Sequence, residues 1–107
     1  MKLEDLPESL RKRYAAGGGT VGGTTDGNAT KLVEVGPAKG LSGPIFARYA
    51  TLMNYSGGQL LFGREHQLGS FALSPGIGYT FDYVDVHRIV IQDNGTPVVW
   101  NIDYTGP

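Results

Sequence analysis

The chain has 107 residues, no cysteine and a nearly balanced charge, with nine lysines and arginines against ten aspartates and glutamates. This length allows one domain with a small core, and without cysteine there are neither disulfides nor the commonest zinc sites. From Lys31 onward, five basic residues face six acidic ones, so we expect no nucleic-acid partner, and the absence of any long apolar run argues against a membrane partner.

Residues 1–16 form the first predicted region. The stretch MKLEDLPESL has acidic residues where a signal peptide needs apolar ones, so we expect a product made in the cytoplasm. Asp5 and Glu8 have the spacing of a capping box and Pro7 suits a first turn, which predicts a short helix from about Leu6 to Ala16.

The predicted helix has one apolar face and a basic C-terminal part. Two interpretations stay open: the helix folds back on its own domain or frays, or it is an arm that docks on a partner. In the second case, the partner-binding residues are Leu3, Leu6, Leu10, Arg11, Lys12, Arg13 and Tyr14.

Residues 17–30 are rich in glycine and threonine. Gly17, Gly19 and Gly22 have the G-x-G-x-x-G spacing of a dinucleotide-binding loop. That fingerprint needs a strand before the glycines and a helix after them, and neither flank fits. We therefore expect a flexible tether over residues 17–30.

From Lys31 the apolar residues follow a period of two, with turn residues about every ten positions. We expect seven short strands and no helix in residues 31–107. The predicted fold class is all-β: a small antiparallel β-sandwich, immunoglobulin-like or jelly-roll-like, preceded by the helix and the glycine-rich arm. The strands are predicted over residues 31–35, 45–55, 59–63, 66–73, 77–83, 86–92 and 97–104.

Three of these strands show which residues share a face. The last strand places Val98, Trp100, Ile102 and Tyr104 on one side, and two earlier strands do the same with Ile77, Tyr79, Phe81 and Tyr83 and with His87, Ile89 and Ile91. The sequence Asp93-Asn94-Gly95 indicates a tight hairpin, so the last two strands should be antiparallel neighbours.

Few side chains suggest chemistry. In the stretch DYVDVH, alternation separates Asp82 from Asp85 and His87, so we expect turn residues and an ordinary strand histidine, with no metal. His66 could act as an acid or base beside Glu65, but no nucleophile or orienting partner accompanies it. We expect no cofactor and no enzymatic activity.

The aromatic residues form the more informative set. We expect Trp100 and Phe81 to fill the core. Tyr83 and Tyr104 lie near strand ends and are candidate surface-binding aromatics, because an apolar ring with a polar tip suits a half-wet surface.

The stretch LMNYSGG to NIDY, residues 52–104, resembles small β-sandwich domains of tailed-phage virion proteins. The shared motifs are turn and strand positions: Asn54 to Gly58, Leu60 to Gly63, Leu73 to Gly76, Tyr79 to Phe81, Val86 to Val90, Asn94 with Gly95, and Val98 to Tyr104.

This resemblance implies a non-enzymatic structural protein of the virion, above all a capsid decoration or cement protein, with head-fibre and tail components as related forms. The implied partners are the major capsid protein or neighbouring copies of the chain, as a homo-oligomer such as a trimer. The alternative is a carbohydrate- or receptor-binding module of a tail or adsorption apparatus, in which exposed tyrosines recognise a glycan.

Overall fold

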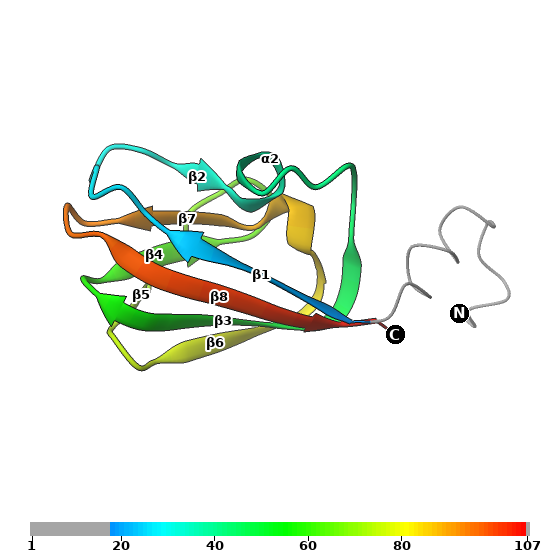
Figure 1. Cartoon of the computed structure of the whole chain (residues 1–107). Helices are drawn as coiled ribbons and strands as arrows, with labels where there is room; N and C mark the ends of the chain where they lie inside the picture. The colour runs from blue at the N-terminus through cyan, green and yellow to red at the C-terminus, as the bar shows by residue number, and fades with distance from the viewer. Residues whose placement is uncertain (1–17, 107) are drawn as a thin grey trace, which may run out of the picture.

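The computed structural model describes residues 18–106, and in this range the protein is all-β, as predicted. Two antiparallel four-stranded sheets make up the domain (Figure 1). The long sheet has the order β1 (Gly19–Thr24), β8 (Val98–Thr105), β3 (Phe46–Gly57) and β6 (Gly78–Asp85), and the short sheet has the order β2 (Val33–Glu34), β7 (Val90–Asp93), β4 (Leu60–Gly63) and β5 (Ala72–Leu73).

One hydrophobic core joins the two sheets. Trp100 and Phe81 are each 3% exposed and belong to it, so the prediction that they fill the core is confirmed. The predicted faces of the last strand are also confirmed, because Val98, Trp100 and Ile102 are buried while Val99 is 41% exposed. The other core members from both sheets include Leu52, Leu60, Phe62, Ile91 and Ile102.

The flexible tether predicted over residues 17–30 is wrong over Gly19–Thr24. Gly19–Thr24 is strand β1, and it pairs with β8 in one unbroken register from Gly19 opposite Tyr104 to Thr24 opposite Val99. Val21 supplies an apolar contact to the core. The predicted N-terminal helical arm, residues 1–16, lies outside the described residues.

Close packing explains the glycines of β1 better than flexibility does. A Cβ at Gly22 would lie 2.8 Å from both the Asn101 side-chain oxygen and the Trp100 carbonyl oxygen. A Cβ at Gly19 would meet the Tyr104 ring, whose hydroxyl would be 2.4 Å away. Side chains of β8 therefore lie flat across β1, and only glycine leaves them room.

Two short helices contradict the expectation that residues 31–107 contain none. They are α2 (Val35–Ala38) and the 3₁₀ helix η2 (Val86–Arg88). His87 is thus not a strand residue: the buried Asp85 carboxylate accepts its backbone N–H at 3.0 Å and starts the helical turn. None of the helices in residues 18–106 is long and apolar enough to cross a membrane.

Tyr83 breaks the alternation that was predicted for β6. Of the four residues expected on one face, Phe81 is buried, whereas Ile77, Tyr79 and Tyr83 are 53%, 46% and 64% exposed. Tyr83 has a φ of 48°, which rotates the chain so that Val84 turns inward. The alternation of buried and exposed residues is also interrupted in the paired strand β3, since Ala47 and Ala50 are both buried although they lie three positions apart.

The last two strands are not neighbours, so the predicted hairpin pairing is wrong. β7 pairs with β2 and β4 in the short sheet, while β8 pairs with β1 and β3 in the long sheet. Asn94 and Gly95 carry the chain across from one sheet to the other, and Gly95 adopts a φ of 109°. A tight turn signal thus marks a change of sheet here.

The carboxylate of Asp93 holds this crossing point together. It is 2% exposed and accepts the backbone N–H groups of Gly27 and Gly95, each at 2.9 Å. Burial acts to raise the pKa of Asp93, but hydrogen bonds from the Thr25 hydroxyl and the two backbone N–H groups outweigh burial and lower the pKa. The Thr25 oxygen also accepts the N–H of Val98 at 2.9 Å, so the Thr25 hydroxyl connects the start of β8 to the Asp93 carboxylate.

We predict that Gly22→Ala lowers the free energy of unfolding by about 1–3 kcal/mol, because the new methyl group would collide with the β8 backbone. The matched control is Gly43→Ala, since a Cβ at Gly43 has no atom within 4 Å, and it should change stability by less than about 0.5 kcal/mol. Chemical denaturation measures both. Equal, negligible effects would contradict an ordered β1.

We predict that Asp93→Asn lowers the free energy of unfolding by about 2–4 kcal/mol near neutral pH, because an amide nitrogen would face the backbone donors. The folded-state pKa of Asp93 is lowered, so its stabilisation is present above the unfolded pKa, about 4, and is lost as the pH falls through the folded value. Urea titrations from about pH 7 to about pH 3 should therefore show the difference between wild type and variant shrinking below about pH 4. The exposed Asp82→Asn is the control, and a difference that does not vary with pH would contradict this role for Asp93.

Candidate functional site

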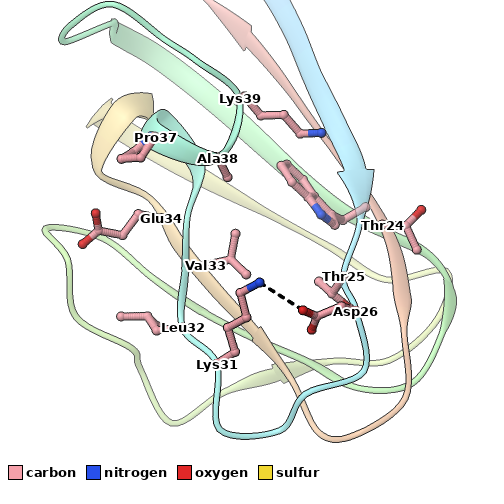
Figure 2. A pocket seen from close by; sticks show the side chains of 11 residues that line it. Thr24, Thr25, Asp26, Lys31, Leu32, Val33, Glu34, Pro37, Ala38 and Lys39 are labelled. Atoms are coloured by element: carbon pink, nitrogen blue, oxygen red, sulfur yellow. Dashed lines mark hydrogen bonds and ion pairs between the residues drawn. The ribbon is translucent and has the colours of Figure 1, made fainter.

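A hollow of about 630 Å³ opens between the end of β1 and the segment that contains β2 and α2. Figure 2 shows Lys31 and Asp26 facing each other across it, with Leu32 and Glu34 further along the same wall as Lys31. The Lys39 ammonium lies 5.6 Å from the ring centroid of Trp100, at a distance typical of a cation–π contact.

The charges of this hollow are largely paired. The Lys31 ammonium is 3.0 Å from an Asp26 carboxylate oxygen, and hydrogen bonds from Lys31 and then from the Asn28 backbone lower the pKa of Asp26. Because Trp100 is only 3% exposed, its ring offers little surface for stacking. The hollow can donate and accept hydrogen bonds with a small polar molecule, but no charged group in it is both buried and without a partner in the described part of the chain.

A second hollow, of about 390 Å³, brings together three residues that the sequence suggested separately. His66, His87 and Tyr83 line it, with Arg88 and Glu65. Asp85 also lines this hollow, but its carboxylate accepts the N–H groups of Ile45 and His87, and Asp82 is not among the lining residues. Within residues 18–106, no three potential ligand side chains are grouped so that they could hold a metal ion.

The turn that carries His66 is strained. Glu65 and His66 have φ values of 57° and 64°, and the Gln67 N–H donates to the Arg64 carbonyl at 3.1 Å, so two bulky residues occupy positions that favour Asn and Gly. Arg88 holds the turn in place: its Nη1 donates to Glu65 at 2.7 Å and its Nε donates to His66 Nε2 at 3.1 Å. The backbone N–H of His66 also donates to the backbone carbonyl of Arg88 at 3.2 Å.

This turn positions Arg64, which sequence reasoning missed. The Arg64 guanidinium reaches β6 and donates to the carbonyl oxygens of Asp82 and Tyr83. The sequence gives no signal for this contact of Arg64, because the contact depends on the positive φ values of the next two residues, Glu65 and His66.

An aromatic cluster beside β6 joins two core rings, Phe62 and Phe81, to the exposed ring of Tyr79. The rings of Phe62, Tyr79 and Phe81 pack with centroids 4.8–5.8 Å apart, around a hollow of about 350 Å³. Phe71, at 77%, is the most exposed large apolar residue in the described part of the chain. Sequence reasoning placed Phe71 in the predicted strand 66–73 but did not single it out, whereas the structure has Phe71 directly before β5.

The two candidate surface-binding tyrosines lie apart. Tyr83 is on β6 and exposed, whereas Tyr104 is on β8, partly buried and packed against the core, with β3 between the two strands. The candidate arm residues, Leu3 to Tyr14, lie outside the described residues.

Comparisons with protein-family models, with curated proteins and with solved structures gave no match to this chain.

We predict that the double variant Glu65→Asn with His66→Gly raises the free energy of unfolding by about 1 kcal/mol or more, because Asn and Gly adopt positive φ at lower cost. Gln67→Gly serves as control, since Gln67 has no positive φ, and it should be neutral or destabilising. Thermal and urea unfolding measure both. A double variant less stable than wild type would show that the contacts of Arg88 outweigh the strain.

Proposed function

We propose that this chain is a non-enzymatic structural protein of a tailed-phage virion, a capsid decoration protein. Its domain and its N-terminal segment together dock on the lattice of the major capsid protein, beside other copies of the chain. Under this proposal the two sheets form a β-sandwich of the immunoglobulin-like or jelly-roll-like type, and the protein resides in the virion.

The observation that carries the proposal is that the first and last strands of the described chain, β1 and β8, lie side by side, with the start of β1 next to the end of β8. Gly19 lies opposite Tyr104, and β1 begins where β8 ends, at the same end of the domain (Figure 1). Tyr49, opposite Thr105, and Tyr83 are 45% and 64% exposed in the same region. A partner that binds residues 1–16 would therefore face exposed aromatic side chains as well.

The positions that resemble phage virion domains have clear geometric roles, which supports the resemblance at the level of the fold. The buried Asn54 amide donates to the carbonyl oxygens of Gly58 and Leu73, both at 2.8 Å, and so ties two turns together. Gly76 and Gly95 have φ values of 86° and 109°, which their turns require.

The alternative, a carbohydrate- or receptor-binding module, is favoured by one observation. Tyr83 projects an exposed ring at a hollow that also presents histidine and arginine side chains, and this combination can stack on a sugar and bind its hydroxyl groups. Tyr104 supports this alternative less, because its ring is partly buried.

We predict that tailed-phage particles purified from cells that carry the gene contain the chain in amounts comparable with the major capsid protein. Leu6→Asp with Leu10→Asp should remove it from the particles while circular dichroism still shows a folded β domain, and Ser9→Asp, on the polar side of the predicted helix, should be retained. Quantitative mass spectrometry of the particles is the measurement.

Absence of the wild-type chain from the particles would refute the virion role, and equal incorporation of the double variant would refute docking through the N-terminal segment. Binding of the full chain to a glycan array, lost in Tyr83→Ala but kept in the exposed Tyr55→Ala, would instead establish the alternative.

A further inference from the structure

Strand β6 is an edge strand of the long sheet and presents unpaired backbone groups. It pairs only with β3, and the Asn54 N–H donates to the Ile77 carbonyl at 3.1 Å. Backbone groups alternate in direction along an antiparallel strand. The N–H and C=O groups that point away from β3 therefore belong to Gly78, Thr80 and Asp82.

Arg64 covers one end of this open edge and leaves the other end uncovered. Its guanidinium donates to the carbonyl oxygens of Asp82 and Tyr83, as a charged side chain often does at a sheet edge. In the described part of the chain, no other side chain or strand hydrogen-bonds to the outward backbone groups of Gly78 and Thr80.

Exposed apolar side chains accompany the open edge. Ile77, Tyr79 and Phe71 are 53%, 46% and 77% exposed, and Tyr79 belongs to the ring cluster with Phe62 and Phe81. The opposite edge of the long sheet differs, because β1 carries three glycines and its apolar residue Val21 packs against the core. An open edge flanked by apolar side chains is a surface that another strand can cover.

The sequence of β6 and its flanks is nearly symmetric about Thr80, reading Ile-Gly-Tyr-Thr-Phe-Asp-Tyr from 77 to 83. If a second copy pairs antiparallel with Thr80 on the two-fold axis, Tyr79 lies opposite Phe81 and Ile77 lies opposite Tyr83. Asp82 then lies opposite Gly78, so no like charges meet. A register centred on Asp82 would place two carboxylates opposite each other.

We propose that β6 is a self-association edge through which two copies of this chain pair antiparallel about Thr80, joining their long sheets into one. Arg64 opposes this pairing, because its guanidinium occupies the Asp82 carbonyl that a partner strand needs. The strained turn at Glu65 and His66, held by Arg88, keeps Arg64 in that place. This inference concerns the domain itself and does not depend on the virion role.

Sedimentation velocity and light scattering on the full chain over a range of concentrations test the proposal. Arg64→Ala should lower the dimer dissociation constant by about tenfold or more, since it frees a backbone acceptor at each end of the paired region. Arg48→Ala is the matched control, because it removes an exposed arginine from the neighbouring strand β3 and should leave association unchanged.

Two further variants test the edge directly in the Arg64→Ala background. Thr80→Pro removes an outward N–H from the centre of the pairing, and Ile77→Lys places a charge on an exposed position that the fold tolerates. Each should return the protein to monomer, with circular dichroism confirming the β fold. An Arg64→Ala protein that stays monomeric, or a dimer or trimer that survives Ile77→Lys, would overturn the proposal.

Discussion

The buried carboxylate of Asp93 is the constraint on which the arrangement of the strands depends. It accepts hydrogen bonds from the backbone N–H groups of Gly27 and Gly95, which are far from each other in sequence, and from the Thr25 hydroxyl. The Thr25 hydroxyl oxygen in turn accepts the N–H of Val98. A buried charge is tolerated only when it is solvated by such donors. Thr25 and Gly27 follow β1, and Gly95 lies in the turn between β7 and β8, so the carboxylate links the end of β1 to the point where the chain leaves the short sheet.

Sequence reasoning succeeded where a strand is regular and failed where one contact overrides the period. The faces of β8 were predictable because its burial alternates regularly, with the buried Trp100 and Ile102 separated by more accessible residues. Strand β1 was not predicted, because Gly19 and Gly22 leave room for side chains of β8, and the sequence does not show which residues pack against a glycine. The positive φ of Tyr83 and the change of sheet after Asp93 are likewise consequences of tertiary contacts.

The candidate surfaces were only partly visible in the sequence for the same reason. Tyr83 is exposed, as a surface-binding residue must be, but Tyr104 lies across Gly19 and is partly buried. Arg64 acquires its position from the turn at Glu65, and Phe71 lies directly before the short strand β5. The N-terminal residues proposed as a docking arm, Leu3 to Tyr14, lie outside the described range.

The two proposals place two contacts on opposite edges of one sheet. Gly19, Tyr104, Ala50 and Phe81 form a row across all four strands, so the start of β1 and the edge of β6 lie about 15 Å apart, three strand spacings. A copy paired through β6 would keep the start of β1 free to lead residues 1–16 to a different partner. Self-association and docking on a lattice are therefore compatible in geometry.

In this structure β1 is an ordered edge strand of the long sheet, paired with β8, and we propose that β6, at the other edge, pairs with a second copy of the chain. Residue-resolved amide hydrogen exchange of the full chain, measured by NMR in dilute and in concentrated solution, tests this arrangement most directly. We expect slow exchange for the amides of Gly19–Thr24 that face β8 at every concentration, and exchange at Thr80 that is fast in dilute solution and slows as the concentration rises. Exchange of β1 at the rate of an unstructured chain, or a Thr80 rate that does not change with concentration, would contradict it.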